Sequence, residues 1–307
     1  MSGQTESARL GGSDQSSRPR SSRTLAASAL LLLFGLLWLL TGQISHEPVY
    51  GGKTLTLWLR TYDPSSPLGR GSREWNETDD AVRHIGTNAI PFLLRMLRET
   101  DSSLKLALAA LAQRQRFIKI HFVPATTRNI EASKAFIVLG DAAKDAVPDL
   151  MKAYDENNSI ESRSAIEEAL SWIGPGAESA VPLLLQAATN ANNEVRANAL
   201  WALGDIHCDA QVCVPVLIRA LGDSDSGARL SAAHALGMFG TEAQSAIPAL
   251  SEMTKPPKSL AVFSITDEVP LEARNALRKI NPDAHSPSGQ SSSAFEIRPV
   301  PPTFPPR

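Results

Sequence analysis

Three side chains that recur at one position of a repeated unit are the strongest candidates for binding chemistry in this chain. They are Glu168, Trp201 and His234, and 33 residues separate each from the next. Such a row suits a protein partner, because aromatic side chains supply much of the free energy of association at interfaces. The polar character of Glu168 and His234 favours exposure of all three. The alternative is that Trp201 packs on the adjacent helix as peripheral core.

Cys208 and Cys213 are the two cysteines of the chain. In an oxidising compartment they could form a disulfide that closes a small loop, whereas two buried free thiols fit the sequence almost as well. Two cysteines are too few for a multi-cysteine zinc framework. The six histidines have no metal-ligand spacing, and no phosphate-binding glycine loop, nucleophile elbow or metalloprotease motif occurs. We therefore predict no catalytic residue, no metal site and no cofactor.

The candidate residues lie in a region where one short phrase is repeated. Pro148, Pro182, Pro215 and Pro248 mark its copies, at intervals of 34, 33 and 33 residues. A fixed period in the 30s with helical patterning indicates helix pairs stacked into a solenoid. Each proline is expected at the start of the first helix of its pair, where its missing N–H would have no helical partner.

The second helix of each pair carries an apolar stripe. Ile166, Ala169, Leu170 and Ile173 are spaced as one face of a helix, and equivalent residues recur 33 and 66 positions later. Glycines at positions 174 and 240 are expected to end these helices, but His207 stands at the intervening position. Because second helices line the concave side of such stacks, the candidate residues are predicted to form a row there.

Three arginines also follow the repeat, and they are a second candidate for ligand binding. They are Arg163, Arg196 and Arg229, which flank the apolar stripe. An arginine there can lay its stem on apolar surface and bond loop carbonyls or an aspartate. We interpret these arginines as structural.

Acidic residues outnumber basic residues in the repeats, although the formal charge of the whole chain is only −2. From Gly140 to Thr254 there are six basic and sixteen acidic residues, a net charge of −10. An acidic surface repels phosphate backbones, so we expect no nucleic-acid partner.

An uncharged apolar segment, residues 24–41, precedes the repeats. Its 18 residues are near the lower limit for spanning a hydrocarbon core of about 30 Å. Arginines precede the segment and no Lys or Arg follows until Lys53, so the positive-inside rule places Met1 in the cytoplasm and the repeats outside. We predict a single-pass signal anchor in the cytoplasmic membrane. The alternative is a cleaved signal peptide and a secreted protein.

Two segments before the main repeats depart from the period. Lys53–Leu59 is expected to form a short helix whose apolar side covers the end of the stack. Pro91 marks an earlier copy of the phrase, but it precedes Pro148 by 57 residues. The excess lies around residues 113–130, where basic residues alternate with apolar and aromatic ones. This stretch could bind an anionic surface, but we favour a degenerate repeat with a buried apolar side.

The phrase Gly-x-x-Ala-x-x-Ala-Val-Pro-x-Leu, followed by Arg-x-x-Ala-x-x-Ala-Leu, resembles the bacterial HEAT-repeat proteins of the PBS-lyase-like class. The resemblance covers roughly Lys53 to Ala284, and both ends of this region are similar to those of secreted or membrane-anchored members. It implies a curved, armadillo-like α-solenoid that binds other proteins. The chain departs from the pattern at His207 and in an insertion from Lys255 to Val269.

The resemblance suggests two chemistries, and the residues support neither. HEAT-repeat enzymes with a di-iron centre use paired His-Glu dyads, whereas this chain has the single dyad His46-Glu47, outside the repeats. Attachment of a bilin chromophore conflicts with the predicted anchor and location.

These observations predict an all-α protein, a HEAT-type solenoid with an N-terminal transmembrane helix. We expect it to act as a membrane-anchored scaffold that binds an unknown protein on its concave face, outside the cytoplasm. The alternative is an accessory or enzymatic, lyase-like HEAT protein acting on a small molecule. The predicted divisions are a disordered tail (1–23), the membrane anchor (24–41), a linker and cap (42–80), the solenoid (81–282) and a disordered Pro-rich tail (283–307).

Overall fold

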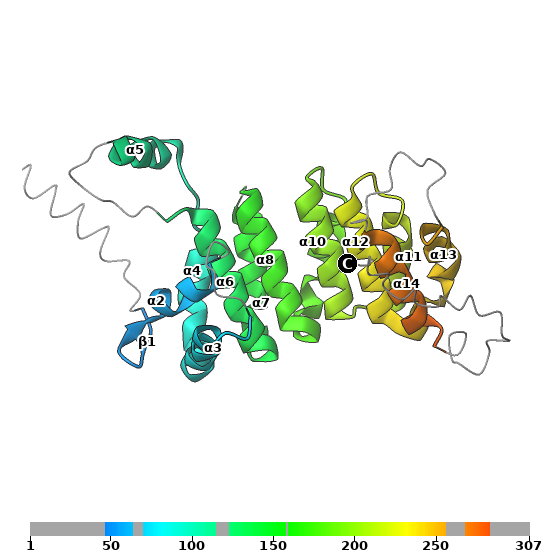
Figure 1. Cartoon of the computed structure of the whole chain (residues 1–307), viewed down its shortest axis with the longest axis horizontal. Coiled ribbons are helices and arrows are strands. Elements are labelled where there is room, and N and C mark those ends of the chain that lie inside the picture. Colours follow the sequence, from blue (N-terminus) through cyan, green and yellow to red (C-terminus); the bar gives the residue numbers. More distant parts are fainter. Residues whose placement is uncertain (1–46, 64–69, 115–122, 158, 256–267, 283–307) are drawn as a thin grey trace, which may run out of the picture. The chain divides into compact units, whose positions relative to one another are not determined.

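The computed structural model describes most of one compact unit that begins at Glu47 (Figure 1). The described residues are 47–63, 70–114, 123–157, 159–255 and 268–282. The two predicted tails and the predicted membrane segment lie outside these ranges, so those predictions remain untested. Within the ranges, no helix combines the length and the apolar character needed to cross a bilayer.

Helices in the described ranges form six successive pairs (Figure 1). The pairs are α2 (Leu55–Leu59) with α3 (Arg73–Ile85), α4 (Ile90–Leu97) with α6 (Ala125–Leu139), α7 (Val147–Glu156) with α8 (Ile160–Ile173), α9 (Val181–Ala187) with α10 (Asn193–Ile206), α11 (Ala210–Ala220) with α12 (Ser226–Phe239), and α13 (Ile247–Met253) with α14 (Glu268–Ile280). Each second helix packs against the second helix of the next pair, so α3, α6, α8, α10, α12 and α14 form one row. The prediction of a helical-repeat solenoid is confirmed for this part of the chain.

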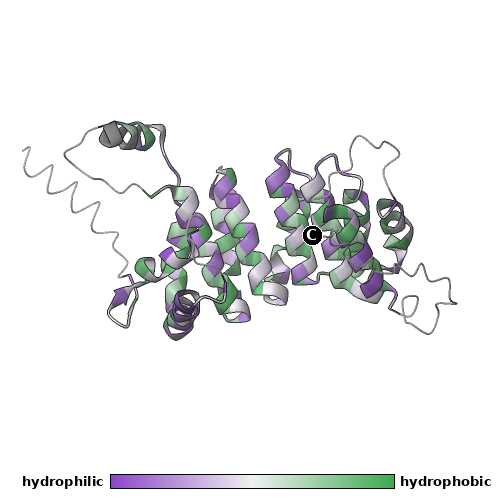
Figure 2. Cartoon of the chain, in the orientation of Figure 1, coloured by the Kyte–Doolittle hydropathy of each residue, from purple (hydrophilic) through white to green (hydrophobic). Residues whose placement is uncertain are grey.

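The predicted apolar stripe forms the core between the second helices. Ile166, Ala169, Leu170 and Ile173 of α8 are all buried, as are the equivalent residues of α10 and α12. The stripe has one alanine in α8 and two in each of α10 and α12, and these small residues let neighbouring helices approach closely. Figure 2 shows the hydrophobic residues interleaved with hydrophilic ones along each of these helices, as expected when one side is buried and another faces water.

Glycine ends four of the second helices because the chain turns there through a conformation that other residues avoid. The glycines are Gly86, Gly140, Gly174 and Gly240, with φ between +49° and +69° and ψ between −129° and −144°. No Cβ is tolerated well in that region. A short 3₁₀ helix follows each glycine and leads into the next first helix: η2 (Gly86–Ala89), η3 (Gly140–Ala146), η4 (Gly174–Ala180) and η5 (Gly240–Ala246).

The junction at His207 differs from the others and corrects one prediction. His207 adopts the left-handed α conformation, φ 56° and ψ 54°, instead of the glycine conformation. Asp209 then caps α11, which begins at Ala210 without a 3₁₀ helix. Pro215 consequently lies inside α11, whereas Pro182 and Pro248 do stand at the starts of their helices. The prediction that Pro215 starts a first helix was therefore wrong.

The N-terminal end of the stack is a complete helix pair preceded by a hairpin. Strands β1 (Val49–Tyr50) and β2 (Lys53–Thr54) pair antiparallel through Gly51 and Gly52, which both have positive φ. Leu55 and Leu59 of α2 are fully buried, as expected for a cap. However, α3 crosses the predicted boundary at residue 80 because Ser72 caps its start and its buried face repeats the second-helix spacing. That face comprises Thr78, Ala81, Val82 and Ile85.

An insertion between α4 and α6 accounts for the long interval between Pro91 and Pro148. The insertion contains α5 (Ser103–Arg114), and α6 is the second helix of this pair. Ala132, Ala135 and Phe136 of α6 are fully buried, 34 residues before the equivalent residues of α8. The second helix of the existing pair begins within the stretch predicted as a degenerate repeat, and the burial predicted for the apolar residues before it stays a prediction. Residues 115–122 lie outside the described ranges.

Candidate protein-binding site

The three predicted site residues lie on consecutive second helices, Glu168 on α8, Trp201 on α10 and His234 on α12. The Trp201 ring stacks on the His234 imidazole with 3.7 Å between centroids and 9° between planes. His234 Nδ1 lies 3.2 Å from Glu272 Oε1 of α14. On the other side, Ser133 of α6 donates a hydrogen bond of 2.6 Å to Glu168 Oε2. One set of contacts therefore links α6 to α8 through Glu168, and a second links α10, α12 and α14 through Trp201 and His234.

Trp201 has features of both alternatives that the sequence left open. Its ring packs on the next helix through His234, as a peripheral core residue would. Even so, 36% of the surface of Trp201 remains exposed to solvent, which places it among the exposed large hydrophobic residues. One ring face is covered by His234, and the exposed part of the residue is available for contact.

Glu168 and Trp201 also line one hollow of about 460 Å³ on the surface of α6, α8 and α10. We call it the acidic hollow. Three of its residues are glutamates, two are tryptophans, and no residue of the set is basic. The lining residues are Thr126, Ile130, Glu161, Ser164, Ala165, Glu168, Ser171, Trp172, Glu194, Asn198 and Trp201. His234 is not among them.

Three further residues of the hollow were not identified from the sequence, namely Trp172, Glu161 and Glu194. Their spacing along the sequence is nevertheless consistent with a shared site. Trp172 follows Glu168 by four residues and so lies on the same side of α8. Glu161 and Glu194 occupy the first turns of α8 and α10, 33 residues apart. A hydrogen bond from Ser159 lowers the pKa of Glu161, which keeps its carboxylate ionised at neutral pH.

Two polar atoms of the acidic hollow are buried without a hydrogen-bond partner among the described residues. They are Ser164 Oγ and Trp172 Nε1. Ser164 is only 6% exposed, yet it lines the hollow. Ser171, which also lines the hollow, is satisfied because it donates to Asp205. Buried polar groups normally find partners, so these two atoms mark places where a bound molecule could supply one.

Two buried glutamates lie outside the acidic hollow and have raised pKa values. Burial raises the pKa of Glu131 to about 7, with a further contribution from Asp63. Burial also raises the pKa of Glu167 well above its usual range, although Tyr154 donates a 2.9 Å hydrogen bond to its Oε1. Both groups are almost fully inaccessible, so we assign them to the core and not to binding.

The three repeated arginines bond the turns between paired helices. Arg163 Nε donates to the Asn157 carbonyl at 2.8 Å. Arg196 donates to the Asn190 carbonyl at 2.8 Å. It also forms an ion pair with Asp223 through two hydrogen bonds, which lower the pKa of the Asp223 carboxyl. Arg229 donates to the Asp223 carbonyl at 2.9 Å. The structural interpretation of these arginines is confirmed.

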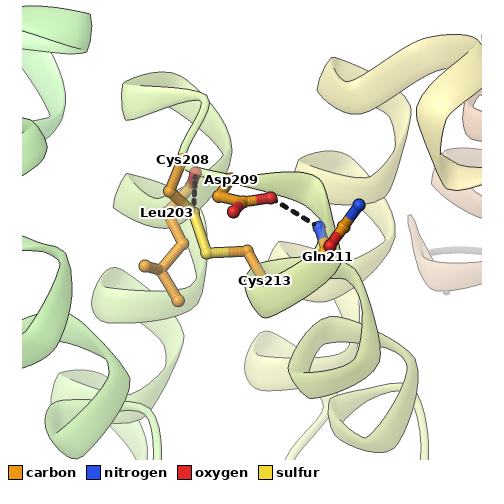
Figure 3. Close-up of a disulfide and its surroundings, with 5 residues drawn as sticks. All are labelled: Leu203, Cys208, Asp209, Gln211 and Cys213. Carbon is orange, nitrogen blue, oxygen red and sulfur yellow. Dashed lines mark hydrogen bonds between the residues drawn. A yellow bond between two sulfur atoms is a disulfide. The ribbon is translucent and has the colours of Figure 1, made fainter.

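Cys208 and Cys213 are joined by a disulfide at the junction that lacks glycine (Figure 3). Their Cα atoms are 6.4 Å apart, and both residues are buried. Cys213 replaces an alanine that is buried at the equivalent position of the neighbouring pairs, Ala180 and Ala246. Beside the disulfide, Asp209 accepts a hydrogen bond from the backbone N–H of Gln211 and caps α11 (Figure 3). The disulfide thus ties Cys208, in the link after α10, to Cys213 inside α11.

No group of three or more His, Cys, Asp or Glu side chains in the described ranges is arranged to hold a metal ion. The acidic hollow therefore presents separate carboxylates and aromatic faces, a combination suited to binding cationic or aromatic groups of another molecule.

Comparison with known protein families identifies helical repeats in part of this chain. Residues 181–263 match the family described as HEAT repeats. No curated protein matches the chain. Among solved structures, it is similar to a designed armadillo repeat protein in complex with the peptide (KR)4, with 16% identity and a TM-score of 0.38, covering 75% of this chain and all of that one. It is also similar to an engineered protein, with 19% identity and a TM-score of 0.36, covering 74% and 96% of the two chains. The family match and the observed helix pairs support a HEAT-repeat protein.

Proposed function

We propose that this chain is a scaffold that binds a protein partner through the row of second helices. The observation that supports the proposal most strongly is the acidic hollow, where exposed tryptophan, carboxylates and unpartnered polar atoms meet on three consecutive helices. Partly exposed tryptophans surrounded by polar groups are typical hot spots of protein interfaces. Glu168, Trp201 and His234 extend the same surface from α8 to α12.

We further propose that residues 24–41 anchor the scaffold in the cytoplasmic membrane and that the repeats lie outside the cytoplasm. The uncharged apolar segment and the arginines that precede it support this topology. The Cys208–Cys213 disulfide supports it independently, because disulfides persist mainly in oxidising compartments. Membrane-anchored members of the PBS-lyase-like HEAT class, which the sequence resembles, would share this arrangement.

Alkaline phosphatase fused after Ile280 is expected to be active in whole bacterial cells expressing the full chain. The enzyme folds only where its disulfides can form, so activity reports transfer across the membrane. A fusion at the same position to a reporter that works only in the cytoplasm should be inactive. The reverse pattern, with a silent phosphatase and an active cytoplasmic reporter, would contradict the proposed topology.

A photo-crosslinking amino acid at Asn198, in the acidic hollow, is expected to capture a defined protein partner that mass spectrometry identifies. The Trp201→Ala change should reduce this capture about tenfold or more, because truncating a hot-spot tryptophan typically costs at least about 2 kcal/mol of binding free energy. The melting temperature should change little, since Trp201 lies at the edge of the core and 36% of the residue is exposed.

The matched control uses Val212, which is 49% exposed on the first helix α11. A crosslinker at Val212 should not capture the same partner, and Val212→Ala should leave capture at Asn198 unchanged. A large fall in melting temperature for Trp201→Ala with capture intact would make Trp201 structural and would remove it as a binding residue.

A further inference from the structure

The charge of the acidic hollow indicates the chemistry of its occupant. Glu161, Glu168 and Glu194 carry formal negative charges there, and no lysine, arginine or histidine is part of the lining. Like charges brought together on one surface repel one another, and a cationic group placed among them removes that repulsion. The hollow is therefore complementary to positive charge.

The tryptophans of the hollow favour side-chain cations over other positive groups. The chain itself provides an example, because the Arg70 guanidinium lies 5.3 Å from the centre of the Trp172 ring. Trp201 has one ring face covered by His234, and the same side chain lines the hollow toward α8. Its remaining surface can accept a guanidinium or ammonium group in the same way.

The unpartnered buried atoms indicate that the occupant also brings hydrogen-bonding groups. Trp172 Nε1 can only donate, so it requires an acceptor such as a peptide carbonyl. Ser164 Oγ, on a residue that is 6% exposed, can accept from a peptide N–H or donate to a carbonyl. A polypeptide backbone supplies both kinds of group at regular intervals.

The spacing of the helices suits an extended segment that crosses them. Adjacent packed helices lie about 8–10 Å apart, which corresponds to roughly three residues of extended chain. An extended segment crossing α8 and α10 would thus pass from one helix to the next within about three residues, and alternate side chains would face the helices. Glu161 and Glu194, at equivalent positions of these two helices, would meet successive cationic side chains.

We propose that the acidic hollow binds an extended polypeptide segment of the partner that carries arginine or lysine side chains. This inference rests on the proposed scaffold function and specifies the chemistry of the partner. The glutamates bind the cationic groups, Trp201 stacks on them, and Ser164 and Trp172 bond the backbone.

The test is binding of a fluorescently labelled hexa-arginine amide to the full chain in detergent micelles. We expect saturable binding that the neutral analogue hexa-citrulline does not reproduce. The triple change Glu161→Gln, Glu168→Gln and Glu194→Gln should weaken binding at least about tenfold, since charge-assisted hydrogen bonds to all three carboxylates are lost. Equal binding of the two peptides would overturn the proposal.

A matched triple variant separates a local site from general attraction by an acidic protein. Asp145→Asn, Asp155→Asn and Glu178→Gln removes three exposed charges outside the acidic hollow from neighbouring parts of the chain. This variant should retain affinity within about threefold of the unchanged protein, because the three exposed charges do not line the hollow and interactions of exposed charges are weakened by salt. Equal loss of affinity in the two triple variants would overturn the site.

The two proposals can fail separately. If the Asn198 crosslinker captures a partner in a Trp201-dependent manner but hexa-arginine does not bind, the scaffold function stands and the cationic chemistry is overturned. If hexa-arginine binds through the three glutamates but no capture depends on Trp201, the chemistry of the hollow stands and the proposed partner-binding role of Trp201 is overturned.

Discussion

Replacing Gly204 with alanine is expected to lower the free energy of unfolding by about 1–3 kcal/mol, the usual cost of forcing an extra group into a packed interior. A Cβ at Gly204 would lie 2.6 Å from the Cα of Ala235 and 2.7 Å from its Cβ. Because the contact is with the backbone of α12, no side-chain rotation can relieve it. Helices α10 and α12 would have to move apart in the middle of the stack.

Urea denaturation followed by circular dichroism measures this effect. The control is Gly222→Ala. Apart from its two neighbours in the chain, the atom nearest to the new Cβ is the Arg219 carbonyl oxygen, at the ordinary contact distance of 3.5 Å. That variant should unfold at nearly the same urea concentration as the unchanged protein. An unchanged midpoint for Gly204→Ala would show that the two helices do not depend on this close approach.

The double change Glu131→Gln and Glu167→Gln is expected to stabilise the protein at pH 8 and to leave its stability nearly unchanged at pH 4. Both pKa values are raised by burial, that of Glu131 from 4.5 to about 7. The folded chain therefore binds more protons than the unfolded chain above about pH 4.5, so the free energy of unfolding falls as pH rises through this range. Glutamine does not ionise, and the gain at pH 8 should be about 3 kcal/mol or more, since one pKa unit corresponds to about 1.4 kcal/mol and the pKa of Glu131 alone is raised from 4.5 to about 7.

The measurement compares urea midpoints at pH 4, 6 and 8 for the unchanged protein and the variant. In Glu167→Gln the new amide oxygen can still accept the Tyr154 hydroxyl, so the change removes the charge and keeps this hydrogen bond. Exchanging the exposed Glu178 for glutamine serves as the control and should leave the pH profile as it was. If the double variant loses stability with rising pH as the unchanged protein does, other groups are responsible.

The sequence was sufficient to predict the helix pairs and their core because both depend on local spacing. Residues such as Ile166 and Leu170 face one side of a helix wherever that helix packs, and the 33-residue period repeats the same solution. Gly174 and Gly240 likewise marked helix ends, since the turn they make requires a residue without a side chain. The cap at Leu55 and Leu59 followed from the need to cover the end of a stack.

Departures from the repeat were harder to predict because each depends on how the chain continues afterwards. His207 does not adopt the glycine conformation, and the resulting left-handed turn allows Asp209 to start α11 early and leaves Pro215 inside it. The hidden pair at the N-terminus was missed because α3 lacks the proline phrase before it, although its buried stripe has the usual spacing.

The sequence by itself determined which residues share a helix face and therefore placed Glu168, Trp201 and His234 in one row. Only the tertiary structure decided that Trp201 stacks on His234, that Glu168 and Trp201 share the acidic hollow while His234 lies outside its lining, and that Trp172 belongs to it. The physical reason is that a hollow depends on the distance between helices. That distance is set by small contacts such as Gly204 against Ala235, which no period along the chain encodes.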